Sequence, residues 1–106
     1  MKTSELTGAA LDWAVAKCMG QENCWMHDYK LGYPVPISTD WSQGGPIIER
    51  EKISTKERGG TWMAVLRPQD GSWPIWGYGP TPLIAAMRCY VASKLGDKVE
   101  LPDTFI

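Results

Sequence analysis

The fold follows from the stretch Thr81-Pro82-Leu83-Ile84-Ala85-Ala86-Met87-Arg88-Cys89-Tyr90-Val91-Ala92-Ser93-Lys94-Leu95-Gly96. Thr81 is a typical N-cap, Pro82 suits the first helical position, and Gly96 suits the end of a helix. Few polar residues interrupt the apolar ones between these two ends. Because a helix that is apolar on nearly all sides is buried, the sequence predicts a central helix over about residues 82–95.

Two predicted strands precede this helix. The first is expected over residues 61–67, where residues 62–66 form a short, continuous apolar run. The second, over residues 73–78, is rich in aromatic side chains. The turn signal Pro68-Gln69-Asp70-Gly71 lies between the two runs, so they are expected to pair as a hairpin. Residues 52–60 are expected to be a polar connector, and residues 47–54 fit a short strand or a helical turn equally well.

A second helix is expected near the N-terminus, over about residues 7–19. Thr7 is a plausible N-cap, Gly20 is a plausible stop, and apolar side chains recur on one face, at Leu11, Ala14, Val15 and Cys18. Residues 21–46 are expected to be irregular, and residues 98–101 could add a short strand. The predicted fold class is α+β, a single domain over residues 1–106, with two main helices packed on a small, mainly antiparallel sheet.

The composition of the chain is that of an ordinary globular protein. It has 106 residues, of which 43% are hydrophobic and 22% charged, and a net charge of −1. Dedicated binders of extended nucleic acid usually carry a basic excess, so that class is disfavoured. The longest apolar runs are far too short to span a bilayer, so no membrane association is expected.

The three cysteines, Cys18, Cys24 and Cys89, lack the spacing of a disulfide framework or a zinc site. They indicate reduced thiols in a cytoplasm. Residues 1–5 show no apolar signal-peptide core, which agrees with that expectation.

The first candidate binding segment is Thr39-Asp40-Trp41-Ser42-Gln43-Gly44-Gly45. Trp41 could stack on a planar group, while the polar side chains and the glycine amides could donate and accept hydrogen bonds. The alternative is a packed Ω-like loop in which Trp41 fills part of the core.

The second candidate segment surrounds the start of the central helix. It supplies Trp76, Tyr78, Gly79 and Thr81, because unpaired amides at a helix N-terminus favour an anion. An ordinary strand-to-helix turn would need the same residues. Arg88 on the apolar helix would require a bound anion or, at the helix edge, an acidic partner. Together with residues 39–45, this segment could form a two-part pocket.

No catalytic, metal-binding or cofactor-binding set is expected. Cys24, His27 and Asp28 are close in sequence, but proximity alone establishes neither a nucleophile–base pair nor a zinc site. An enzyme that uses Cys24 or His27 is therefore the least favoured hypothesis.

Three motifs resemble the NinX-like family, which comprises small proteins of tailed bacteriophages and prophages with no assigned function. The motifs are Leu6–Ala16, Ser38–Trp41 with Gly44–Ile48, and Gly79–Arg88. The resemblance implies a phage-encoded protein that acts in the bacterial host's cytoplasm, and it carries over no catalytic residue, substrate or cofactor.

The leading hypothesis is a non-enzymatic binding protein that sequesters a nucleotide-like small molecule, for example a host immune signal, and thereby counters host defence. The alternative is an interaction factor whose aromatic surface binds and modulates a host protein. A concave pocket would favour the first hypothesis and a flat exposed patch the second. A homo-oligomer is expected in either case.

Overall fold

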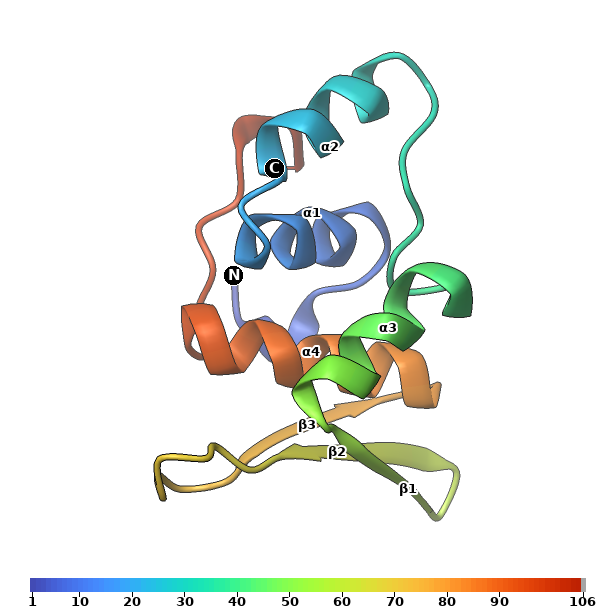
Figure 1. Cartoon of the computed structure of the whole chain (residues 1–106). Coiled ribbons are helices and arrows are strands. Elements are labelled where there is room, and N and C mark those ends of the chain that lie inside the picture. Colours follow the sequence, from blue (N-terminus) through green and yellow to red (C-terminus); the bar gives the residue numbers. More distant parts are fainter. Residues whose placement is uncertain (106) are drawn as a thin grey trace.

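Helix α4 (Pro82–Leu95) crosses the middle of the molecule and separates a small sheet from the other helices (Figure 1). The computed structural model describes residues 1–105. The other elements, in chain order, are the 3₁₀ turn η1 (Thr3–Glu5), α1 (Gly8–Cys18), α2 (Glu22–Lys30), α3 (Trp41–Glu51), β1 (Ser54–Arg58), β2 (Thr61–Leu66), β3 (Ile75–Gly79) and η2 (Asp103–Phe105). The predicted α+β class is confirmed.

The predicted central helix is confirmed with its bounds. The Thr81 hydroxyl accepts a hydrogen bond from the Ile84 amide at 3.1 Å, and Pro82 occupies the first helical position. Gly96 ends the helix with a backbone φ of +84°, in the left-handed region that favours glycine. Seven residues of α4 are buried, so both sides of the helix lie in the core.

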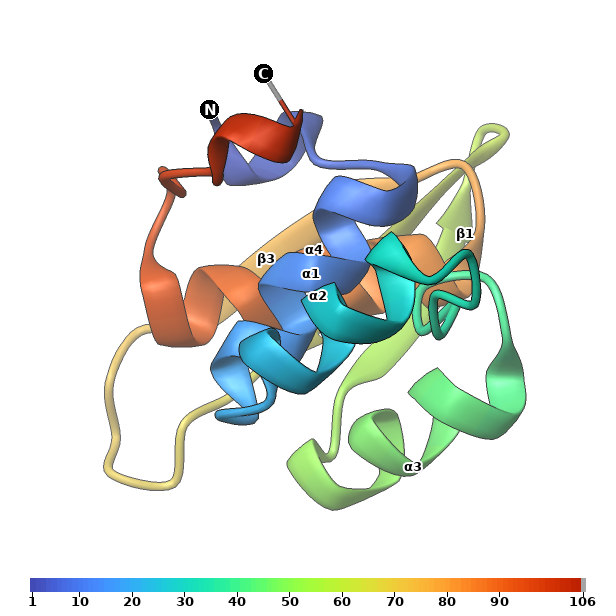
Figure 2. The same cartoon turned by 90° about the horizontal axis from the view of Figure 1, so that it is seen from above.

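The three strands form an antiparallel sheet in the order β1-β2-β3. The predicted hairpin is confirmed as β2 and β3, with Met63 opposite Tyr78 and Ala64 opposite Gly77. Trp73 precedes β3 and is 89% exposed. All four α-helices lie on one side of the sheet (Figures 1 and 2).

Helix α1 confirms the predicted N-terminal helix to within one residue at each end. It packs on α4 on the side away from the sheet, and its buried residues include Leu11, Ala14 and Val15. Helix α2 packs in turn on α1. The described chain is therefore layered as sheet, α4, α1 and α2.

The prediction that residues 21–46 are irregular was wrong at both ends. Helix α2 buries only Trp25, whose indole nitrogen donates to the Val35 carbonyl at 2.9 Å. A helix that buries one side chain has almost no apolar period, so the sequence pattern did not indicate it.

Helix α3 replaces the expected loop at residues 41–46, although it contains Gly44, Gly45 and Pro46. Tertiary packing outweighs their poor helix propensity: a Cβ on Gly44 would lie 2.6 Å from Leu83 Cδ1 and 2.7 Å from the Ile37 carbonyl oxygen. The helix ends before Lys52, whose φ is +56°. Residues 47–51 are therefore helical.

Strand β1 lies within the segment expected to be a polar connector, and that prediction was also wrong. All five residues of β1 are exposed, so no apolar alternation marks the strand. It forms by pairing with β2 along its whole length. The suggested strand at residues 98–101 is reduced to a single bridge between Lys98 and Lys2.

Asp12 anchors the segment that leads into α3. The carboxylate is 6% exposed and accepts a hydrogen bond from the Ser38 amide at 2.7 Å. Burial raises the pKa of Asp12 above its ordinary value, because desolvation disfavours the charged form. The folded state therefore holds the Asp12 proton more tightly than the unfolded state does.

This pKa shift predicts a pH dependence of stability. The contribution of Asp12 to the free energy of unfolding should fall as the pH rises from about 4 through its raised pKa. Asp12→Asn keeps an oxygen acceptor and should lose this slope, whereas Asp12→Ala should lose about 1–3 kcal/mol because the Ser38 amide is left unpaired. Urea unfolding at several pH values measures both effects; equal slopes for Asp12→Asn and the wild type would contradict the first.

Candidate functional site

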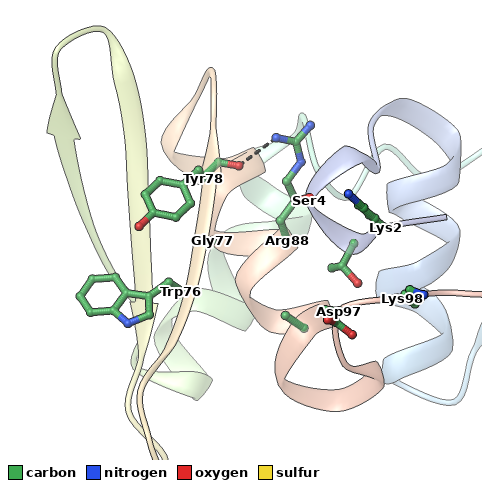
Figure 3. A pocket seen from close by; sticks show the side chains of 10 residues that line it. Lys2, Ser4, Trp76, Gly77, Tyr78, Arg88, Asp97 and Lys98 are labelled. Atoms are coloured by element: carbon green, nitrogen blue, oxygen red, sulfur yellow. Dashed lines mark hydrogen bonds between the residues drawn. The ribbon is translucent and has the colours of Figure 1, made fainter.

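A pocket of about 360 Å³ lies beside strand β3 (Figure 3). Its walls come from three parts of the chain: residues 2–4, the strand segment 76–78 and the segment 88–98. It contains three of the predicted site residues, Trp76, Tyr78 and Arg88. The pocket thus brings together residues that the sequence placed in the second candidate segment.

Hydrogen bonds between distant segments build the outer wall of the pocket. The Thr3 hydroxyl donates to the Gly96 carbonyl at 2.7 Å, and the Thr3 amide donates to the Asp97 carbonyl at 2.8 Å. The bridge between Lys2 and Lys98 continues this contact. Thr3 is 3% exposed, so the wall is fixed by a buried anchor.

Arg88 extends from α4 toward the rim of this wall. Its Nε donates to the Leu6 carbonyl at 2.8 Å, and its Nη1 donates to the Tyr78 carbonyl at 2.8 Å (Figure 3). A guanidinium has five N–H groups, so three N–H groups of Arg88 remain available besides these two hydrogen bonds. Within residues 1–105 the one ion pair found is Arg50–Glu51, so the expected acidic partner of Arg88 is absent there.

The electrostatics of the pocket favour an anion. Arg88, Lys2 and Lys98 supply three positive charges, and Asp97 supplies one negative charge. Burial lowers the pKa of Arg88, because its guanidinium is partly withdrawn from water without a neutralising carboxylate. A bound anion would neutralise the charge of Arg88, which no carboxylate among residues 1–105 does.

Strand β3 contributes a free backbone edge to the pocket. It is the last strand of the sheet, and its Tyr78 carbonyl points to Arg88 instead of to β2. Backbone groups alternate between the two sides of an antiparallel strand, so Trp76 presents its N–H and C=O to the same side. These are a donor and an acceptor next to the cationic wall.

The rings of Trp76 and Tyr78 point away from Arg88, to the other side of β3 (Figure 3). Gly77, between them, faces α4, where a Cβ would lie 2.5 Å from the Ala85 carbonyl oxygen. Trp76 and Tyr78, two residues apart on β3, therefore lie on the same face of the strand. It is the uncovered face of the sheet, and β3 meets the pocket through its backbone.

The first candidate segment lies outside this pocket. Asp40 caps α3: its Oδ1 accepts hydrogen bonds from the Ser42 amide at 2.9 Å and from the Ser42 hydroxyl at 2.7 Å. These contacts keep the pKa of Asp40 below its ordinary value. Thr39 and Gln43 are exposed, and Gln43 lines a smaller cavity next to Trp25.

The remaining predicted residues have structural roles or lie on the surface. Trp41, the first residue of α3, is 55% exposed and fills no part of the core. Gly44 and Gly79 are buried against α4, while Gly45 is half-buried and Thr81 caps α4. Close helix packing accounts for the glycines at 44 and 79 without a ligand. The pocket beside β3 contains no residue from 39–45.

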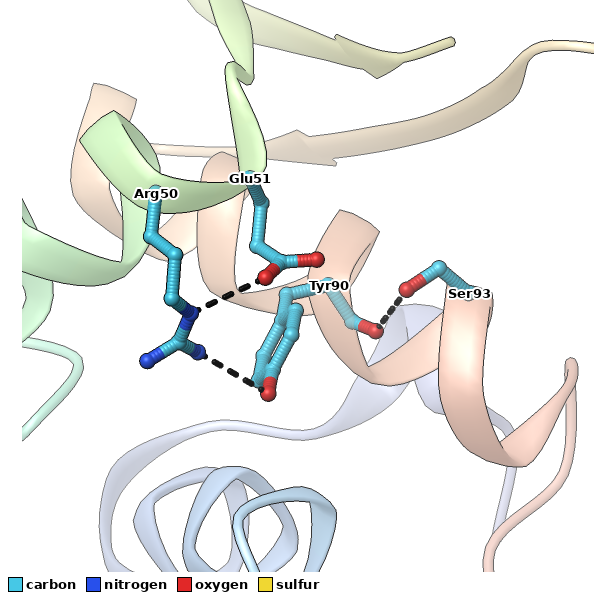
Figure 4. A network of polar contacts seen from close by, with 4 residues as sticks. All are labelled: Arg50, Glu51, Tyr90 and Ser93. Carbon is cyan, nitrogen blue, oxygen red and sulfur yellow. Dashed lines mark hydrogen bonds and ion pairs between the residues drawn. The ribbon is translucent and has the colours of Figure 1, made fainter. Parts of the chain in front are cut away.

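A second, more basic pocket of about 370 Å³ is lined by Arg50, Lys52, Arg67 and Lys94. Arg50 donates to Glu51 at 3.0 Å and to the Tyr90 hydroxyl at 3.3 Å (Figure 4). Two helices, α3 and α4, end here, and cations normally stabilise the negative ends of helix dipoles. The helix ends account for Arg50, Lys52 and Lys94 without a ligand, so this pocket is the poorer candidate for an anion site.

The cysteines show no arrangement typical of catalysis. Burial raises the pKa of Cys18 and of Cys89 to about 11, so both thiols stay protonated at neutral pH. Cys24 is exposed and shares a cavity with Asp28, and His27 is absent from that cavity's lining. Among residues 1–105, no cluster of three or more His, Cys, Asp or Glu could hold a metal ion.

The comparison with known families shows to which family the chain belongs. The family model described as "Bacteriophage P22, NinX" matches residues 2–94, which include β3, Arg88 and Lys2. The chain belongs to this NinX family. No curated protein matches it. The resemblance read from the three motifs is thus confirmed. The residues that line the pocket beside β3 lie in the matched part, except for Asp97 and Lys98.

Sequence reasoning missed Lys2, Thr3, Ser4 and Lys98 as pocket residues. They come from opposite ends of the chain, and the one signal that could have suggested them is the short strand proposed at residues 98–101.

Within the part of the chain that the structure describes, every helix is too short or too polar to cross a bilayer.

Proposed function

We propose that this member of the NinX family is a non-enzymatic binding protein that holds a nucleotide-like anion in the pocket beside β3. The observation that carries the proposal is Arg88, a partly buried guanidinium without a carboxylate partner in residues 1–105. Membership of a phage family supports the setting, an infected bacterium. Sequestering a host signal nucleotide in the host cytoplasm, and assembly into a homo-oligomer, are further parts of this proposal.

The charges and the fixed donors support a phosphate-bearing ligand. The three free N–H groups of Arg88 can meet phosphate oxygens in the forked geometry that arginine offers. Lys2 and Lys98 extend the positive field along the wall, and the Ser4 hydroxyl can add a hydrogen bond. Because the guanidinium is held by two backbone carbonyls, it is oriented before the ligand arrives.

The size and the strand edge support an organic group beside the phosphate. A volume of about 360 Å³ is within the usual range for small-molecule sites and exceeds what an inorganic anion fills. The N–H and C=O of Trp76 form a donor–acceptor pair, which is the pattern that the edge of a nucleobase recognises. A nucleotide would therefore use both the cationic wall and the backbone edge.

The test combines ligand discovery with a charge variant. Purified protein is incubated with lysate from infected, defence-activated bacteria, washed and heat-denatured, and the released molecules are identified by mass spectrometry. The recovered nucleotide is then titrated calorimetrically. Lys2→Ala/Lys98→Ala should weaken binding about tenfold or more, which corresponds to about 1.4 kcal/mol, and should leave the fold intact because both side chains are exposed.

Lys17→Ala/Lys30→Ala is the matched control, because it removes the same charge from the last turns of α1 and α2. It should bind like the wild type. Equal weakening by both double variants would show a general charge effect and would reject the pocket. A chemically converted product would identify an enzyme, and no enriched nucleotide from several lysates would remove the proposal.

A host-protein partner is the second candidate, and the exposure of Trp41 favours it. Trp41 is 55% exposed outside the pocket, and tryptophan is enriched in interface hot spots. The two proposed functions differ in the residues whose substitution should impair them. Trp41→Ala should abolish capture of a host protein and leave nucleotide binding unchanged, as measured by co-purification and calorimetry of the same variant.

A further inference from the structure

The sheet has one covered and one uncovered face. All four α-helices lie on the α4 side (Figures 1 and 2), and the register of the strands identifies the side chains on the other side. Tyr78 pairs with Met63, which pairs with Lys56, while Trp76 pairs with Val65. We call this surface the open face; its side chains are Ser54, Lys56, Arg58, Thr61, Met63, Val65, Trp76 and Tyr78.

Aromatic rings dominate the β3 side of the open face. Trp76 is 46% exposed and Tyr78 is 54% exposed, and they stand two residues apart on one strand. Two residues of strand span about 7 Å, so the rings are side-by-side platforms for flat groups. Met63 and Val65 on β2 are half-buried and form an apolar floor beside them.

Basic side chains occupy the β1 side of the same face. Lys56 lies in the row of Met63 and Tyr78, and Arg58 lies one row further along β1, opposite Thr61. The acid between them, Glu57, alternates to the α4 side of the sheet. The open face therefore has two cations and no carboxylate among its strand residues.

We propose that the open face binds a short single-stranded nucleic acid. Bases stack on Trp76 and Tyr78, the apolar floor covers their edges, and the phosphates approach Lys56 and Arg58. Stacking platforms combined with a positive border are the general means of binding single strands. Exposed aromatic rings on an open sheet serve the same purpose in other nucleic-acid-binding domains.

The net charge of −1 does not oppose this kind of binding. Phosphate neutralisation supplies most of the affinity for a duplex, whereas stacking supplies much of the affinity for an unpaired strand. The charge that matters is local, and on the open face it is positive. The surface lies on the other side of β3 from the Arg88 pocket, so the proposal is independent of the nucleotide proposed there.

The test uses a fluorescein-labelled twelve-residue oligodeoxythymidine and measures fluorescence anisotropy with the full chain. Trp76→Ala and Tyr78→Ala should each weaken binding about tenfold. Lys56→Ala/Arg58→Ala should weaken it and make the dependence on salt less steep, because fewer counterions are released. Trp41→Ala is the matched control, an exposed tryptophan on α3, and should bind like the wild type.

Other outcomes would overturn the proposal. Absence of binding at a protein concentration of about 10⁻⁴ M, the weak end of the usual range for non-specific sites, would overturn it. Equal losses for Trp76→Ala and Trp41→Ala would also do so. Light scattering that shows a dimer, abolished by Trp76→Ala, would assign the face to a second copy of the chain. Oligonucleotide binding lost in Lys2→Ala/Lys98→Ala but kept in Trp76→Ala would place the strand in the Arg88 pocket instead.

Discussion

Gly77→Ala is expected to lower the free energy of unfolding by about 3 kcal/mol, the upper part of the usual range for overpacking. A Cβ at this position would lie 2.5 Å from the Ala85 carbonyl oxygen, 2.6 Å from the Cys89 amide nitrogen and 2.8 Å from Cys89 Cβ. Two of these are backbone atoms of α4, so no side-chain rotation relieves the contact. The strand and the helix must separate.

Thermal unfolding measures this effect, and the midpoint should fall by at least about 10 °C in a domain of this size. Ser54→Thr is the control, because it adds a methyl group to an exposed strand residue and should change stability by less than about 0.5 kcal/mol. A Gly77→Ala variant as stable as the wild type would mean that β3 and α4 do not pack this closely.

Met87→Ala is expected to cost about 2–5 kcal/mol. Met87 is 0% exposed and lies in the middle of α4. This helix packs on the sheet and on α1. Removing most of its side chain leaves a cavity that packed layers cannot readily fill. Urea unfolding monitored by tryptophan fluorescence gives the loss directly.

Met63→Ala is the matched control for this change, since the same atoms are removed from a half-buried position on the open face. Its loss of stability should be clearly smaller, because water already reaches part of that side chain. Similar losses at the two positions would contradict the placement of α4 at the centre of the molecule.

The elements predicted correctly are those whose signals are local and strong. Helix α4 has its cap, its first-turn proline and its apolar body within sixteen residues, and β2 and β3 flank a clear turn. The sequence did not predict helix α3, because Gly44, Gly45 and Pro46 disfavour a helix locally. Only tertiary contact with Leu83 and residue 37 outweighs that preference. The sequence did not predict strand β1, because its residues are exposed and polar and only the pairing with β2 defines it as a strand.

The candidate site was predicted in part for a similar reason. Trp76, Tyr78 and Arg88 lie within thirteen residues, and the structure places them around one strand. Lys2 and Lys98 reach the same pocket from 96 positions apart, through a bridge that no local pattern specifies. Gly44 and Gly79 resembled ligand-contact positions. Glycine has no side chain, and this allows a ligand or a packed helix to approach the backbone equally closely.

The wall formed by residues 1–6 and 96–99 has a dynamic consequence. Its hydrogen bonds close loops of more than 80 residues, as from Arg88 to Leu6 and from Thr3 to Gly96, and they lie outside the three-stranded sheet. Such a wall can open while the sheet and α4 stay folded. Hydrogen exchange at the amides of Thr3 and Val99, which donate to Asp97 and Met1, then reports the open population. A molecule held in the pocket slows that exchange, so occupancy becomes visible as protection at residues that need not touch the ligand.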